Sequence, residues 1–219
     1  MVGLLRKDFY YIRDYGRAYL PLLLLFCLVP GALGGAYALT LALAMPRSTI
    51  ASDEIRWDRM AVMLPCRAEA VVGGKYLLCG LCVAVGTVLS ALSVMGQQAA
   101  AGFLAARGME TAALWPMSWL EALEYAVIQG GFALLIAALT VPLFYRFTAR
   151  KGAVWANILV ICLLNVTGVW SFNSLYSAPV ETKVLAVALL MGLALAACAA
   201  SCALSVRFYR RRQRGWYGS

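Results

Sequence analysis

The residues that could carry out chemistry in this chain are few, and their pattern argues against catalysis. None of the 219 residues is a histidine, which removes imidazole acid–base chemistry and histidine metal ligation. A phosphate-binding loop is also missing, because Gly73-Gly74-Lys75 is followed by Tyr76 instead of Ser or Thr. The H-E-x-x-H and G-x-S-x-G patterns of hydrolases do not occur. We therefore expect no enzyme activity, no catalytic residue and no cofactor bound by this chain itself.

Two kinds of residue pair remain as candidates for chemistry. Cys79 and Cys82 form a C-x-x-C pair, but no second pair follows at zinc-site spacing, and six of the seven cysteines lie in apolar runs. Carboxylates are paired at positions 53/54 and 121/124, each at the end of an apolar run, where a solvated surface is the simpler interpretation. We expect no metal site.

Three polar side chains fall deep inside apolar runs: Gln129, Asn157 and Asn165. They can form hydrogen bonds between helices, or they can line a path for a transported molecule. No Asp, Glu, Lys or Arg lies unambiguously inside these runs, whereas an ion-coupled carrier usually needs an ionisable group near the midplane of the membrane. Few and uncharged polar groups suit an amphipathic peptide or a lipid-like cargo.

The overall composition explains why chemistry is so sparse. Hydrophobic residues make up 63% of the chain and charged residues 13%, and the mean hydropathy is +0.79. Soluble domains are nearer 45–50% apolar and about 25% charged. The 19 Lys and Arg residues against 10 Asp and Glu fit the basic flanks of membrane helices and contacts with anionic lipid. The bilayer is the expected partner of this surface, and nucleic acid is not.

The apolar runs predict an all-α polytopic membrane protein with six transmembrane helices in a single transmembrane domain, residues 1–219. An amphipathic helix at 3–17 precedes them and lies in the membrane interface, because Leu5, Phe9 and Ile12 fall on one side and Arg6, Tyr10, Arg13 and Arg17 on the other. We expect the six spans at about 18–33, 34–52, 76–96, 122–145, 153–171 and 184–206. A polar region at 53–75 separates the second span from the third, and a basic tail follows the last span at 207–219.

The distribution of basic residues decides whether the first apolar run, 18–46, crosses the membrane once or forms a hairpin. A single span would leave most basic residues outside the cell. A tight hairpin near 30–35 places 17 of the 19 basic residues inside and only Arg107 and Lys183 outside, as the positive-inside rule prefers. A cleaved signal peptide would place 47–75 outside and spoil this asymmetry. We therefore expect both termini in the cytoplasm, with the hairpin either spanning the membrane or re-entrant.

The most patterned polar stretch is 52–78. Residues 57–64 can form a helix with Trp57, Met60 and Leu64 on one face, and Pro65 ends it. A second helix then starts near Arg67 and continues into the third span. Such a helix–break–helix between two spans presents an aromatic and apolar face with flanking charges to a soluble partner. A solvated interfacial loop is the alternative.

Three motifs in this first third resemble the permease subunits of type-2 ATP-binding-cassette (ABC) exporters, in the branch that includes the phenol-soluble-modulin exporter permeases. They are L-L-R-K-D-F-Y at 4–10, D-E followed by W-D at 53–58, and L-P-C-R-A-E-A-V-V-G-G-K-Y-L at 64–77. Arg67 and Ala68 stand where that branch has Ser and then Arg. The order and spacing of the motifs carry the resemblance.

The resemblance implies a half-transporter subunit of the plasma membrane. Two permease chains, identical or similar, would pair, and separate cytoplasmic ATPase subunits would bind ATP and Mg. Region 53–75 would act as the coupling helix, with Trp57 and Met60 in an ATPase groove and charged residues at its rim. The full set of expected coupling residues is Asp53, Glu54, Trp57, Asp58, Arg59, Met60, Pro65, Arg67 and Lys75.

Two other classes of function remain open. A non-transporting membrane adaptor, sensor or self-immunity protein would share the same spans. A membrane-embedded enzyme would have only Glu121 and Glu124 as a carboxylate site.

Overall fold

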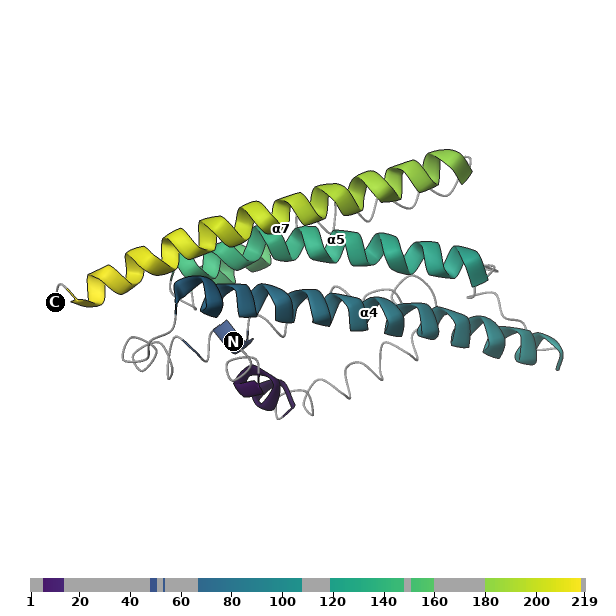
Figure 1. The fold of residues 1–219 in the computed structure, drawn as a ribbon. Helices are drawn as coiled ribbons and strands as arrows, with labels where there is room; N and C mark the ends of the chain where they lie inside the picture. The colour runs from purple at the N-terminus through teal and green to yellow at the C-terminus, as the bar shows by residue number, and fades with distance from the viewer. Residues whose placement is uncertain are drawn as a thin grey trace.

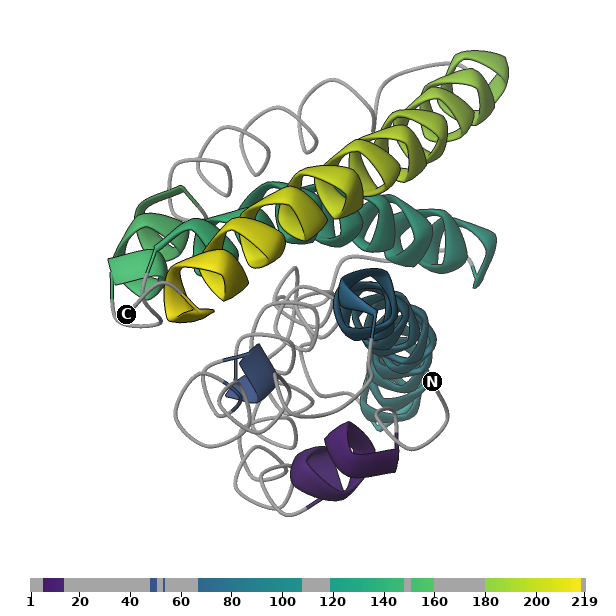
Figure 2. The same cartoon turned by 60° about the vertical axis from the view of Figure 1, so that its left-hand side comes forward.

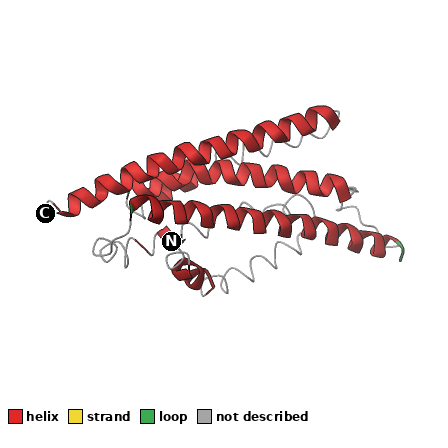
Figure 3. Ribbon diagram, viewed as in Figure 1, coloured by secondary structure: helices red, strands yellow, loops and turns green. Residues whose placement is uncertain are grey.

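The computed structural model describes residues 6–13, 48–50, 53, 67–107, 119–147, 151–159 and 180–217, and nearly all of these residues are helical. Three long helices dominate: α4 (Ala68–Ala105), α5 (Trp119–Arg146) and α7 (Val180–Tyr217). Shorter helices cover 6–13 and 151–159. Figure 3 shows helices and turns in these ranges and no strand. The all-α prediction is confirmed for the described residues.

Helix α4 runs antiparallel to α5 and α7, and the latter two run parallel to each other (Figures 1 and 2). The contacts show the register: Tyr76 of α4 meets Ser201 of α7, and Leu134 of α5 meets Cys198 of α7. The start of α4 and the ends of α5 and α7 therefore lie together. We call this end of the bundle the basic end, because α5 closes there with Arg146 and α7 with Arg207–Arg212. The directions agree with the alternation expected for the third, fourth and sixth spans.

Three helices of the described part are long and apolar enough to cross a membrane: Ala68–Phe103, Leu123–Arg146 and Thr182–Gln213, with 36, 24 and 32 residues. A bilayer core of about 30 Å needs about 20 helical residues. Helices α4, α5 and α7 each contain one predicted span, at 76–96, 122–145 and 184–206 respectively. The predicted spans 18–33 and nearly all of 34–52, and most of 153–171, lie outside the described residues.

Two helices extend beyond the spans predicted from hydropathy. Helix α4 begins at Ala68, and the carbonyl oxygen of Arg67 accepts the backbone N–H groups of Ala70 and Val71 at 2.9 and 3.3 Å. The prediction of a helix that starts near Arg67 and continues into the third span is confirmed. Helix α7 continues to Tyr217, so most of the basic tail predicted at 207–219 is the final turns of a membrane helix.

Glycines allow α5 to pack closely against both neighbours. A Cβ atom on Gly130 would collide with the hydroxyl of Thr87 in α4. On Gly131 it would lie 3.0 Å from Leu190 and 3.2 Å from Met191 in α7. Small residues at such crossings let membrane helices approach and gain dispersion contacts.

A proline inside α5 creates the polar link that joins all three helices. Pro142 has no N–H, so the carbonyl of Ala138, four residues earlier, loses its helical donor. The hydroxyl of Ser201 in α7 donates to this carbonyl. Tyr76 Oη of α4 lies 2.5 Å from Ser201 Oγ and 2.9 Å from Ser205 Oγ. Since the Ser201 proton goes to the carbonyl, Tyr76 donates to Ser201 and accepts from Ser205.

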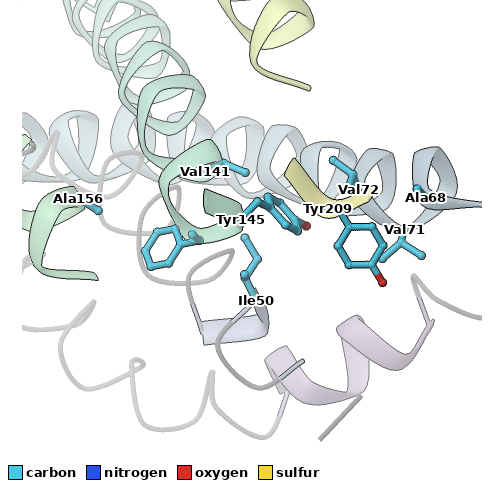
Figure 4. Close-up of a cluster of buried hydrophobic side chains, with 9 residues drawn as sticks. Ile50, Ala68, Val71, Val72, Val141, Tyr145, Ala156 and Tyr209 are labelled. Atoms are coloured by element: carbon cyan, nitrogen blue, oxygen red, sulfur yellow. The ribbon is translucent and has the colours of Figure 1, made fainter. Parts of the chain in front are cut away.

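The hydrophobic core lies at the basic end (Figure 4). The rings of Tyr145 in α5 and Tyr209 in α7 meet edge to face, with centroids 5.9 Å apart and planes at 84°. Ile50 packs into the same cluster and so attaches the segment 48–50 to the bundle. The buried members of this cluster are Ile50, Ala68, Val71, Val72, Val141, Phe144, Tyr145, Ala156 and Tyr209.

Candidate functional site

Four charged side chains from distant parts of the sequence meet at the basic end, and we call them the charge quartet: Lys7, Asp8, Asp53 and Lys75. The Nζ atom of Lys75 lies 2.7 Å from Oδ1 of Asp8 and 2.6 Å from Oδ2 of Asp53. Lys7 pairs with Oδ1 of Asp53, and its Nζ lies 3.5 Å from Oδ1 of Asp8. Each lysine therefore contacts both carboxylates, and the quartet is electrically neutral.

The quartet is largely removed from solvent. Lys75, Asp8 and Asp53 are 3%, 4% and 8% exposed. The side chain of Lys7 is 30% exposed and forms the solvent edge. Burying ionised groups costs several kcal/mol each, and close, mutually paired geometry offsets that cost. The four groups depend on one another, because removal of one leaves an opposite charge buried.

Three separate segments supply these side chains and are held together by them. Helix 6–13 contributes Lys7 and Asp8, the segment ending at Asp53 contributes one carboxylate, and the second turn of α4 contributes Lys75. Helix 6–13 and residues 48–50 lie beside the first turns of α4 (Figures 1 and 2).

The quartet also adjoins the hydrophobic core. A small cavity between them is lined by Asp53 together with Ile50, Val71, Tyr145 and Tyr209 of the cluster and by Arg212. The ion pairs and the core thus form one continuous packed region at the basic end.

The quartet contains both ends of the region predicted to couple to an ATPase, 53–75. Asp53 and Lys75 are its first and last residues, and their ion pair closes the base of this segment. Arg67 is described and exposed, directly before α4. The remaining predicted coupling residues lie outside the described residues: Glu54, Trp57, Asp58, Arg59, Met60 and Pro65.

Sequence reasoning missed Lys7 and Asp8 as partners of this region. The available indication was the K-D pair inside the motif at 4–10, 46 residues from Asp53 and 67 from Lys75 in the chain. Within helix 6–13 the guanidinium carbons of Arg6 and Arg13 lie 5.7 and 5.2 Å from the ring centre of Tyr10, and the predicted position of this helix in the membrane interface stays a prediction.

The residues predicted to line a translocation path are not brought together by the described part of the structure. Gln129 donates to the hydroxyl of Tyr125 at 3.2 Å within α5. Asn157 is exposed on helix 151–159, whose Ala156 packs beside Phe144 near the basic end. From Phe144 to Gln129 the helix rises about 22 Å. Asn165 lies outside the described residues.

A second ion pair joins α4 to α7 at the basic end. Arg210 donates to the carboxylate of Glu69, and their side chains are 55% and 53% exposed. Exposed pairs of this kind contribute at most about 1 kcal/mol. This pair therefore marks the alignment of the two helices more than it stabilises them.

The carboxylates of the charge quartet are engaged in joining chain segments. In the described residues no group of three or more His, Cys, Asp or Glu side chains could hold a metal ion. The carboxylates of Asp8 and Asp53 are occupied by lysines. The charge quartet therefore links helix 6–13 and Asp53 to the second turn of α4.

Comparison with known proteins adds the family. No curated protein and no solved structure matches the chain. A family model described as ABC-2 family transporter protein matches residues 3–210, which include the whole charge quartet, α4, α5 and most of α7. Permeases of this family work with cytoplasmic ABC ATPases in general. The chain belongs to the ABC-2 family of transporter proteins and is a membrane permease component of an ABC transporter.

Proposed function

We propose that this chain is the membrane-spanning subunit of an ABC exporter, in the branch that resembles the phenol-soluble-modulin exporter permeases. It is a multi-pass protein of the plasma membrane with six spans and both termini in the cytoplasm. Two permease chains, either identical or similar, form the translocation path. Separate cytoplasmic ATPase subunits bind ATP and Mg and drive it. An amphipathic peptide or a lipid-like molecule is the cargo class that suits its uncharged spans.

The ion pair between Asp53 and Lys75 is the observation that carries the proposal. A segment that transmits force to a membrane helix must be held firmly where it joins that helix. Here an ion pair holds Asp53, at one end of region 53–75, against Lys75, which lies in the second turn of α4, a helix of 38 residues, and Asp8 of helix 6–13 pairs with the same lysine. We therefore expect a movement of the segment between Asp53 and Lys75 to be passed on to α4.

Within this region, Trp57 and Met60 fill a groove of the ATPase, and Glu54, Asp58, Arg59 and Arg67 set register at the rim. The exposure of Arg67 supports this arrangement. Asp53 and Lys75 do not contact the ATPase, because their side chains are buried in the charge quartet, and they instead hold the ends of the region together. Pro65 separates the docking helix from the helix that enters the membrane.

Purification of the tagged full-length chain from its host in mild detergent tests the proposal. We expect a stoichiometric ATPase with a nucleotide-binding motif to be recovered with the wild type and lost with Trp57→Ala/Asp58→Ala. The matched control is Trp155→Ala, which removes a tryptophan that is 55% exposed on helix 151–159 and should retain the ATPase.

Equal recovery of the ATPase with both variants would show that region 53–75 is not part of the docking surface. Recovery of the chain alone, under conditions that keep a control exporter intact, would favour a membrane adaptor, sensor or self-immunity protein.

A further inference from the structure

The arginines near the end of α7 differ in their surroundings, although the sequence presents them as one basic run. Arg210 pairs with Glu69 of α4. Arg212 is half-buried and lines the small cavity beside the hydrophobic core. Arg207 and Arg211 are exposed and share one face of the helix, because residues four apart lie one above the other. The structure thus separates two outward-facing arginines from those that contact other parts of the bundle.

The face that carries Arg207 and Arg211 continues as the open apolar face of α7. Followed toward the start of the helix in steps of three or four residues, it has exposed Leu or Ala side chains at positions 204, 200, 196, 193 and 189. The side of the helix that packs against α4 and α5 is a different one, and it carries the buried residues Ala194, Ser201, Ser205 and Tyr209. An exposed apolar face of a membrane helix is in contact with lipid, so the two arginines lie directly below lipid acyl chains.

The depth of the two arginines matches that of lipid phosphates. Helix rise places Arg207 about 4.5 Å beyond Leu204, and Arg211 about 10.5 Å beyond it. The headgroup layer is about 5–8 Å thick on each side of a bilayer. Side chains in a helix lean toward its N-terminus, which for this end of α7 is the direction of the bilayer. Both guanidinium groups can therefore reach the headgroup layer.

No ion pair neutralises Arg207 or Arg211 within the described residues. The described carboxylates of the basic end are Asp8, Asp53 and Glu69, and each is paired with another basic side chain. Two guanidinium groups one helical turn apart offer several N–H donors to one phosphate, in the paired geometry that arginine forms with phosphate oxygens. The face thus combines an apolar surface at hydrocarbon depth with an unbalanced positive charge at headgroup depth.

We propose that Arg207 and Arg211 form a binding site for the phosphate of an anionic glycerophospholipid, whose acyl chains lie along the exposed apolar face of α7. A second copy of this chain fits this face less well. A two-fold axis along the membrane normal would bring identical faces together at equal depth, so the arginines of one copy would meet those of the other. An acidic surface of a soluble partner would leave the apolar part of the face unused.

Native mass spectrometry of the delipidated full-length chain, titrated with phosphatidylglycerol or with phosphatidylcholine of the same acyl chains, tests the proposal. We expect the wild type to bind phosphatidylglycerol more tightly. Arg207→Gln/Arg211→Gln should lower this preference about tenfold or more, because each basic residue near an anionic headgroup contributes roughly fivefold in affinity.

The matched control is Arg210→Gln/Lys151→Gln, which removes two positive charges from the same end of the bundle. Arg210 is already paired with a carboxylate, and Lys151 is exposed on another helix. This protein should therefore keep the preference for phosphatidylglycerol. Equal unfolding temperatures of the two double variants without lipid show that a difference in binding does not come from a difference in folding.

An unchanged preference in Arg207→Gln/Arg211→Gln would overturn the proposal. Equal loss of the preference in both double variants would also overturn it, since the total charge of this end and not one face of α7 would then decide binding. If Arg207→Gln/Arg211→Gln kept the preference but lost a copurified ATPase or changed the oligomeric state, the occupant of the face would be that protein. The proposal does not depend on the function proposed above, because it requires only that α7 crosses a membrane.

Discussion

At the residue scale, the charge quartet explains how a lysine is accommodated at the start of a membrane helix. Lys75 lies in the second turn of α4 and is 3% exposed, so its charge is removed from water at a cost in free energy. Asp8 and Asp53 offset this cost. The sequence indicated that Asp53 and Lys75 matter. Their contact depends on how segments dozens of residues apart pack, and no local pattern contains that information.

Replacement of Lys75 should strongly destabilise the protein. Lys75→Met leaves two carboxylates at the quartet with only Lys7, and breaking a buried pair from one side costs about 3–5 kcal/mol. Thermal unfolding in detergent measures the loss. Lys151→Met, at an exposed lysine of the same end, should leave the unfolding temperature nearly unchanged.

The charge-balanced variant Lys75→Met/Asp8→Asn keeps one lysine and one aspartate, and it should recover part of the lost stability. A Lys75→Met protein as stable as Lys151→Met would contradict the importance of the quartet.

At the element scale, helix existence was predictable and helix contacts were not. Hydropathy located the spans inside α4, α5 and α7, and Pro65 with Arg67 indicated where α4 begins. Hydropathy did not predict that α7 continues to Tyr217, because a helix need not end where the apolar run does. Pro142 was visible in the sequence, but its consequence depends on the register of α5 against α7, which places Ser201 at the carbonyl of Ala138.

The link between Pro142 and Ser201 predicts non-additive stability changes. Ser201→Ala should cost about 0.6 kcal/mol and at most about 1.7 kcal/mol, the average and the maximum measured for hydrogen bonds between membrane helices. Pro142→Ala restores an N–H donor to the Ala138 carbonyl, so Ser201→Ala should cost clearly less in that background. A double-mutant cycle of unfolding free energies in detergent checks this, and strict additivity would show that the serine does not serve the proline-freed carbonyl.

At the scale of the whole molecule, charge and helix direction agree. The antiparallel course of α4 against α5 and α7 gathers the arginines of α5 and α7 at one end, together with the charge quartet. In the topology proposed above this end faces the cytoplasm, as the positive-inside rule prefers. The sequence predicted this division of charge. It did not predict that helix 6–13 and the segment ending at Asp53 meet the start of α4.

Accessibility of introduced cysteines tests this orientation. In a cysteine-free background, Leu120→Cys at the start of α5 should react with a membrane-impermeant maleimide in intact cells, because Leu120 is 48% exposed at the end opposite the basic end. Arg211→Cys should react only after the membrane is permeabilised. The reverse pattern would invert the topology and place the charge quartet outside.

Site-specific photocrosslinking in living cells tests most directly the claim that region 53–75 docks on a cytoplasmic ATPase. A photoreactive phenylalanine analogue replaces Met60, or Trp155 as the control position. The account predicts an adduct between this chain and an ABC ATPase from position 60 and none from position 155. Absence of an ATPase adduct at position 60, with the protein present in the membrane at wild-type abundance, would contradict it.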